Sequence, residues 1–228
     1  MNLMESLFDY RKLLQDRNTR IYIAVFILGI VGVGGYYAYS WHSNNVQKLA
    51  QKAFSESLEV YKQALSLDFA KEVPEKDRQN LWAEAEIAFK TGYQQNKSST
   101  LAPFFLAYEA QALLKQNKLD QAYEALSDGL KKIPSSSPFS YLYQVTQALI
   151  EIDKQDVQKG VDSLEKLTKD KNNPLKDMAV FYLGEYYLSN NEIAKARLQF
   201  ESLDSMKTDA KQDSPWVTLA KARLQQLA

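Results

Sequence analysis

The chain has no cysteine and only one histidine among its 228 residues. The lack of cysteine excludes a disulfide framework and any thiolate metal site. The single histidine, His42, lies directly after the apolar run of residues 21–41, so we expect neither a Ser-His-Asp arrangement nor a histidine-rich metal site. The phosphate-cradling motifs GxxxxGKS/T and GxGxxG are absent as well. We therefore expect a protein that is not an enzyme, with no catalytic, cofactor-binding or metal-binding residues.

A net charge of one sign is also lacking, because 28 basic residues balance 28 acidic ones. Beyond residue 41 the balance persists, with 24 basic and 25 acidic residues. Such a domain carries no global field that would attract a polyanion. We therefore expect no nucleic-acid partner.

Long hydrophobic runs are missing too, with one exception near the N-terminus. Residues 21–41 read IYIAVFILGIVGVGGYYAYSW and contain no charged side chain. As a helix, these 21 residues span about 30 Å, the thickness of a bilayer's hydrocarbon core. Three tyrosines and a tryptophan gather at the far end, where amphipathic rings settle at the lipid headgroups. The pattern predicts a transmembrane helix over 21–41, between a tail of residues 1–20 and a domain of residues 42–228.

The basic residues beside this run indicate its orientation. Four lie on the N-terminal side and only two lie in the first 15 residues after it: Arg11, Lys12, Arg17 and Arg20 against Lys48 and Lys52. Positively charged flanks are retained in the cytoplasm. We therefore expect the tail in the cytoplasm and the C-terminal domain across the membrane.

A cleaved signal peptide is the alternative interpretation of the same run. Ala38 and Ser40 offer small residues at the two positions that a signal peptidase inspects. The run is longer than the usual apolar region of about 7–15 residues, and bulky aromatic residues crowd the cut. These features favour an uncleaved anchor, and either outcome exports the same domain.

Beyond the anchor, apolar residues recur every three or four positions, which is the helical period. Prolines separate or begin the periodic stretches, where they are tolerated: Pro74, Pro103, Pro134, Pro138, Pro174 and Pro215. Serine and threonine beside several of these prolines offer N-cap oxygens. The pattern predicts helical hairpins and a last helix over 215–227.

An internal repeat runs through this region. Ala85-x-x-x-Phe89-x-x-Gly92 is matched by similar triplets that begin at three later small residues: Ala122, Gly160 and Ala196. The spacings between the four leading residues are 37, 38 and 36. A small residue followed by a large apolar one four later suits a helix that a neighbour crosses closely. We infer that four similar units stack on one another.

The best unit resembles a tetratricopeptide repeat, with Leu183-Gly184-x-x-Tyr187 in a first helix, then Ala196 and Phe200 in a second. The unit from Tyr141 departs most, since Glu151 stands where an aromatic is usual and Gly160 replaces the alanine. The resemblance implies an all-α protein. Its N-terminal transmembrane helix is followed by a tetratricopeptide-repeat-like α-solenoid of about four helical hairpins and a C-terminal capping helix.

In that family the first helices line a concave groove that binds proteins. Carrying over the family's offsets gives a mostly apolar lining, suited to hydrophobic or unfolded segments: Phe104, Ala107, Gln111, Lys115, Leu142, Val145, Leu149, Asp153, Met178, Phe181, Glu185 and Ser189. The alternative is that several of these residues pack against the adjacent repeat.

The whole layout also resembles a narrower family, the bacterial inner-membrane proteins of the YfgM type that are ancillary to the SecYEG translocon. The stretches that look alike are the span GIVGVGGYYAYSW, the segment NNPLKDMAVFYLGEYYL and the terminal SPWVTLAKARLQ. The resemblance implies a single-pass protein of the inner membrane with a periplasmic domain. It implies a non-catalytic, chaperone-like role, with translocon subunits, a membrane-anchored periplasmic prolyl isomerase and unfolded exported chains as partners.

Two other functions stay open from the sequence. The first is a scaffold for another cell-envelope assembly, such as secretion, cell-wall or division machinery. The second is a membrane-anchored hydrolase, which would need a pair of carboxylates in a concave pocket with a raised pKa.

The absence of native cysteine allows a direct test of the orientation. Single cysteines introduced at residue 5 or in a late repeat are exposed to a membrane-impermeant thiol reagent in cells with a permeabilised outer membrane. We expect labelling of the late-repeat cysteine only, because residue 5 would lie in the cytoplasm, and the unmodified chain reports background. Labelling of residue 5 alone would reverse the orientation.

Overall fold

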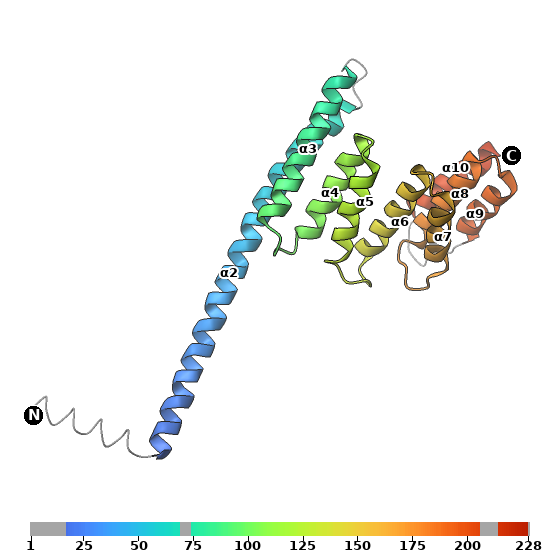
Figure 1. Cartoon of the computed structure of the whole chain (residues 1–228). Helices are drawn as coiled ribbons and strands as arrows, with labels where there is room; N and C mark the ends of the chain where they lie inside the picture. The colour runs from blue at the N-terminus through green and yellow to red at the C-terminus, as the bar shows by residue number, and fades with distance from the viewer. Residues whose placement is uncertain (1–16, 69–73, 206–213, 228) are drawn as a thin grey trace, which may run out of the picture. The chain divides into compact units, whose positions relative to one another are not determined.

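A computed structural model describes residues 17–68, 74–205 and 214–227, and within these it describes side chains over 40–68, 74–203 and 214–227. These ranges are helical, with short connecting turns and no strand (Figure 1). The helices are α2 (Arg17–Asp68), α3 (Glu75–Gln95), α4 (Ala102–Lys115), α5 (Leu119–Leu130), α6 (Pro138–Asp153), α7 (Val157–Lys169), α8 (Lys176–Ser189), α9 (Ile193–Ser205) and α10 (Pro215–Gln226).

The chain divides into two compact units, Met1–Leu49 and Ala50–Ala228. The predicted span over 21–41 falls within α2, but the side chains of residues 17–39 lie outside the described residues, as does the tail up to residue 16. Among the residues that the structure describes, no helix is long and apolar enough to cross a membrane. The transmembrane helix and the cytoplasmic tail therefore stay predictions from the sequence.

The second unit is a row of helical hairpins (Figure 1). The part of α2 after residue 50 packs against α3, and the next hairpins are α4 with α5, α6 with α7, and α8 with α9. Helix α10 closes the row against α8 and α9. The all-helical prediction of four hairpins and a capping helix is confirmed, and the last helix ends within a residue of its predicted end.

Local sequence determines where these helices begin and how the hairpins turn. The hydroxyls of Ser137 and Ser214 accept hydrogen bonds from the backbone N–H two residues later, at 3.3 and 3.2 Å, with proline as the first helical residue. Inside three hairpins the turn contains one residue with positive φ: Asn117 at 58°, Gln155 at 68° and Asn191 at 59°. Asparagine tolerates this left-handed conformation better than most side chains. The turn predicted at Asn190-Asn191 is therefore confirmed.

The repeated small and large residues form the core of the hairpins. Ala85, Ala122 and Ala196 are fully buried, and the large partners four residues later are 0 to 3% exposed. Burial of such side chains is worth about 1.5–3 kcal/mol each, and every cluster includes residues from at least two helices. Each hairpin therefore needs its neighbour to bury its apolar face.

At Gly160 helix α7 lies directly against the backbone of α6. A Cβ atom at this position would lie 2.5 Å from the carbonyl oxygen of Ala148 and 2.6 Å from a side-chain carbon of Ile152. The first contact is with backbone, which cannot rotate away. Glycine replaces the repeat's usual alanine here because α6 and α7 approach too closely for a methyl group.

Gly160→Ala is therefore expected to lower the free energy of unfolding by about 1–3 kcal/mol, as overpacking does. The sign is informative, because glycine to alanine in an unobstructed helix raises stability by roughly 0.5–1 kcal/mol. Urea unfolding followed by circular dichroism measures the change. Gln158→Ala, at an exposed position of the same helix, serves as the control and should change stability by less than about 0.5 kcal/mol. A stabilised Gly160→Ala variant would show that the helices are less tightly packed.

Candidate protein-interaction surfaces

The apolar residues of the predicted groove divide into buried and partly exposed ones. Val145 and Met178 lie in the cluster shared by α6, α7 and α8, and Phe181 lies in the cluster of α8, α9 and α10. Their exposed fractions are 0, 9 and 6%. These three side chains pack against neighbouring helices, which was the alternative interpretation for part of the groove.

The remaining apolar groove residues are partly accessible: Phe104, Ala107, Leu142 and Leu149. Phe104 of α4 meets Phe139 of α6 edge to face, with ring centroids 4.7 Å apart. Phe139 is 44% exposed, and it was not among the residues predicted from the sequence. Its position directly after the helix-starting Pro138 was the available signal. These residues give the first helices α4 and α6 a partly exposed apolar stripe.

The polar groove residues join consecutive first helices of the row. Gln111 of α4 accepts a hydrogen bond from the hydroxyl of Tyr61 of α2 at 2.7 Å. Lys115 pairs with Asp68 at 2.7 Å, and this hydrogen bond lowers the pKa of the Asp68 carboxyl. Gln111 and Lys115 therefore lie next to α2, apart from Glu185 of α8.

At the other end of the row, Glu185 of α8 accepts two hydrogen bonds from Arg223 of α10, at 2.8 and 2.9 Å. A bidentate pair of this kind fixes the relative orientation of two helices as well as adding energy. Glu185 therefore holds the capping helix α10 against α8 through this ion pair. Whether the groove residues bind a protein stays a prediction.

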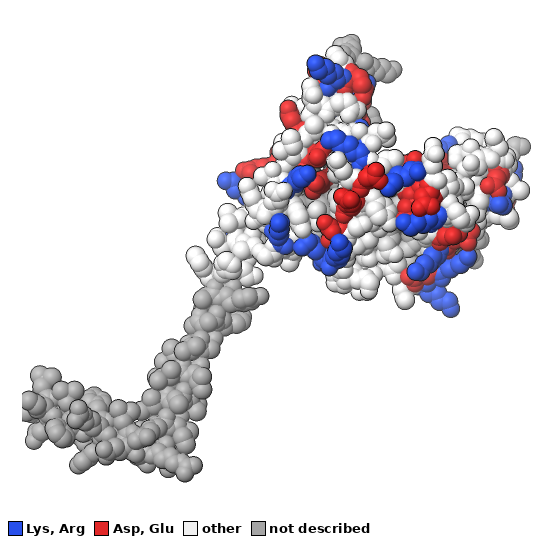
Figure 2. All heavy atoms as spheres, in the orientation of Figure 1, with Lys and Arg blue, Asp and Glu red and all other residues white. Residues whose placement is uncertain are grey.

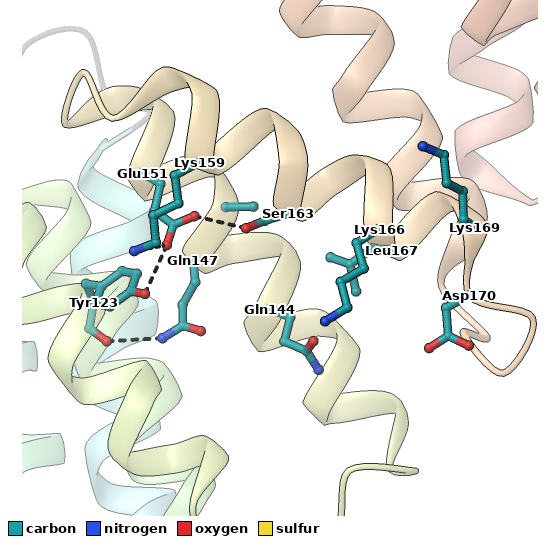
Figure 3. Close-up of a pocket in the computed structure, with 11 residues that line it drawn as sticks. Tyr123, Gln144, Gln147, Glu151, Lys159, Ser163, Lys166, Leu167, Lys169 and Asp170 are labelled. Atoms are coloured by element: carbon teal, nitrogen blue, oxygen red, sulfur yellow. Dashed lines mark hydrogen bonds and ion pairs between the residues drawn. The ribbon is translucent and has the colours of Figure 1, made fainter.

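The structure also contains a cleft that the sequence did not predict. It has a volume of about 540 Å³ and lies between α5, α6 and α7 (Figure 3). Gln144, Gln147 and Glu151 line it from α6. At about 100° per residue, this face of α6 is roughly opposite to the face that carries Leu142 and Leu149. The cleft therefore opens on the other side of the first helix from the predicted groove.

A buried carboxylate lies at the base of this cleft. Glu151 is 6% exposed, and its two oxygens accept hydrogen bonds from the hydroxyls of Tyr123, at 3.0 Å, and Ser163, at 3.2 Å (Figure 3). The ammonium of Lys159 lies 2.8 Å from the same carboxylate, and this hydrogen bond raises the pKa of Lys159. The charge is thus paired and hydrogen-bonded, as burial requires. This explains how glutamate can replace the repeat's usual aromatic residue.

The rim of the cleft is basic on the α7 side. Lys159, Lys166 and Lys169 line it, and Lys169 pairs with Glu165 on its own helix at 2.9 Å. This basic character is local. On the face of the molecule drawn in Figure 2, basic and acidic side chains are interspersed over the repeats, with no broad surface of one sign.

No family model matches the chain, and no curated protein matches it. Solved structures do match. A tetratricopeptide repeat protein from Parabacteroides merdae superposes with a TM-score of 0.52 at 14% identity, over 79% of this chain and 60% of that one. BtubC from P. vanneervenii gives 0.50 at 13% identity, over 80% and 82%. Kinesin light chain TPR-like repeats from Podosopora anserina give 0.51 at 14% identity, over 82% and 86%.

At these identities the likeness shows the fold alone. The second unit is a tetratricopeptide-repeat-like helical domain, and that part of the sequence prediction is confirmed. The chain spans 60% of the length of the Parabacteroides protein. The narrower resemblance to the YfgM type stays a prediction.

Replacing the buried carboxylate tests the cleft's internal network. Glu151→Ala leaves the hydroxyls of Tyr123 and Ser163 without their acceptor, so the free energy of unfolding should fall by about 1–3 kcal/mol. Glu165→Ala removes an exposed partner of Lys169 and should cost less than about 0.5 kcal/mol. Chemical denaturation at neutral pH compares the two variants. Equal effects would contradict a structural role for the Glu151 network.

Proposed function

We propose that the chain is a membrane-anchored tetratricopeptide-repeat protein that acts as a non-catalytic interaction or chaperone-like module beside the Sec translocon. In this role it assists newly exported proteins in the periplasm of a bacterium. The observation that carries the proposal is the stack of tetratricopeptide-like hairpins, because this fold presents a continuous face of first helices to a protein partner.

The face of the first helices supports a weak, permissive binding function. Its accessible apolar residues are few: Phe104, Ala107, Phe139, Leu142 and Leu149. Gln111, Lys115 and Glu185 on this face are engaged with neighbouring helices, so they define no charged clamp for a peptide terminus. A shallow apolar stripe of this kind suits hydrophobic segments of many sequences.

The apolar run over 21–41 supports the tether. Anchoring a weak binding face beside an exit channel raises its effective concentration towards emerging chains into roughly the millimolar range. A weak affinity is then sufficient, and it also allows release. Membrane association and the YfgM-type resemblance together favour the translocon over other sites in the envelope.

Site-directed crosslinking tests this proposal, again using the lack of native cysteine. A photo-crosslinker is attached to a cysteine at Gln111 or Leu149 on the first-helix face, and in the matched control at Gln158 on α7. We expect adducts with translocon subunits and exported chains from the first two positions in intact membranes, and at least several-fold fewer from the control.

Co-purification from detergent extracts provides an independent measurement, with translocon subunits as the expected partners. Adducts only with other envelope proteins would overturn the translocon assignment and favour a scaffold for another assembly. Equal adducts from all three positions would overturn the assignment of the binding face.

A further inference from the structure

A second cleft of about 300 Å³ lies between α3, α4 and α5. It occupies the same place in its repeat as the cleft between α5, α6 and α7, because each lies between two successive second helices with a first helix at its base. The two clefts are related by the 38-residue spacing between Ala122 and Gly160. On this spacing, Glu109 and Leu113 of α4 correspond to Gln147 and Glu151 of α6.

Glu109 lines this second cleft from α4 and is only 7% exposed. No hydrogen bond or ion pair reaches its carboxylate from any residue that the structure describes. Burial raises the pKa of the Glu109 carboxyl to about 7, against the opposing attraction of Lys90. The two oxygens of Glu109 are not among the fully buried atoms that lack a partner, so the carboxylate is accessible from the cleft and a ligand there can reach it.

The acidic neighbours of Glu109 are already paired with other residues. On α3, Glu86 is bound by Lys118 at 2.8 Å and by Gln116 at 3.0 Å. On α5, Asp128 pairs with Lys131 at 2.7 Å. Both carboxylates add to the raised pKa of Glu109.

The two lysines that line the cleft, Lys90 and Lys97, do not donate a hydrogen bond to Glu109. Lys90 forms no ion pair within 4.0 Å of Glu109 among the described contacts, and Lys97 lies over the ring of Tyr93, 5.9 Å from its centroid. The donor for Glu109 is therefore missing from the cleft's own side chains.

Comparison of the two clefts shows which groups the second one lacks. Around Glu151, α7 supplies the ammonium of Lys159 and the hydroxyl of Ser163. The corresponding residues of α5 are Gln121 and Ala125, which supply neither. Further along the same face, the basic Lys166 of α7 corresponds to the acidic Asp128 of α5. The α5 side of the second cleft is therefore acidic where the α7 side of the first cleft is basic.

We propose that the cleft between α3, α4 and α5 binds a basic side chain of a partner protein, whose cationic group donates hydrogen bonds to Glu109. Glu124 and Asp128 on α5 line the same cleft and attract a positive charge to its entrance. The apolar walls Leu106 and Leu113 accommodate the aliphatic stem of a lysine or arginine. The site is separate from the first-helix face, and it does not depend on a location beside the translocon.

Binding of a cation at this site is coupled to the release of a proton. Only the ionised carboxylate attracts a cation strongly, so affinity should rise with pH through the pKa near 7. For a single group of this pKa, the affinity at pH 8 is expected to be about tenfold higher than at pH 6. Bound cation in turn lowers the pKa of Glu109.

The test uses the full-length protein labelled with carboxyl ¹³C-glutamate and the probe N-acetyl-arginine amide. Glu109→Gln identifies the Glu109 resonance, and N-acetyl-citrulline amide has the same shape as the probe without its charge. We expect the arginine probe to lower the pKa of Glu109 by about one unit. The citrulline probe should leave the pKa unchanged. Both probes are added to the unmodified chain, and the variant serves only to assign the resonance.

The variants supply the second readout. Glu109→Gln should lose at least tenfold in affinity for the arginine probe and lose the pH dependence. Glu84→Gln, at an exposed position of α3, should keep both and is the matched control. An unchanged pKa of Glu109 with the arginine probe, an equal shift with citrulline, or equal binding by Glu109→Gln would each overturn the proposal. None of these outcomes bears on crosslinking from the first-helix face.

Discussion

Close approach of helix backbones at one small residue in each second helix is the constraint on which the rest of the domain depends. Ala85, Ala122 and Ala196 are 0% exposed, and at Gly160 the carbonyl oxygen of Ala148 leaves no space for even a methyl group. The large residue four positions later then fills the interval above the crossing. Because close-packed interiors tolerate neither voids nor extra atoms, this pair of sizes determines how one hairpin is placed on the next. The residues that start the helices and form the turns need only allow this placement of the hairpins.

Away from these crossings the repeats differ in sequence, and in particular in the charged residues around their clefts. Glu151 and Glu109 are both buried glutamates on first helices, one turn apart in repeat register. One is surrounded by a lysine and two hydroxyls, whereas the other has none of these. The same backbone thus supports two clefts of different electrostatic character. Differences between repeats in such a fold are where specificity can reside, since the crossings themselves are alike.

Much of the fold could be predicted from the sequence, because its determinants are local and repeated. Prolines, serine caps and the Asn190-Asn191 turn act within a few residues, and the small and large pair keeps its phase through four units. The sequence left open whether groove residues pack against the adjacent repeat, and it could not identify Val145, Met178 and Phe181 as the buried ones. Helix offsets indicate the direction of a side chain and not how closely its neighbour packs.

The two clefts could not be predicted from the sequence. Each is built from three helices. Its lining residues extend from Tyr123 to Asp170 in one cleft and from Lys90 to Asp128 in the other, so no short sequence window contains either. The available signal was a glutamate at position 109, where the best repeat has Leu183, and a second glutamate at 151, where it has Tyr187. Polar residues at positions that a repeat reserves for apolar ones are therefore worth examining for unpaired charge.

The left-handed residues at Asn117, Gln155 and Asn191 have a consequence for the ancestry of the domain. The hairpins α4–α5, α6–α7 and α8–α9 reverse direction through the same backbone conformation, so the turn of one of these units does not depend on the sequence of the next. A segment of 36 to 38 residues could then be duplicated or deleted in the gene without disturbing any turn. The length of the row is thus free to change in evolution by whole units, while the capping helix α10 stays at its end.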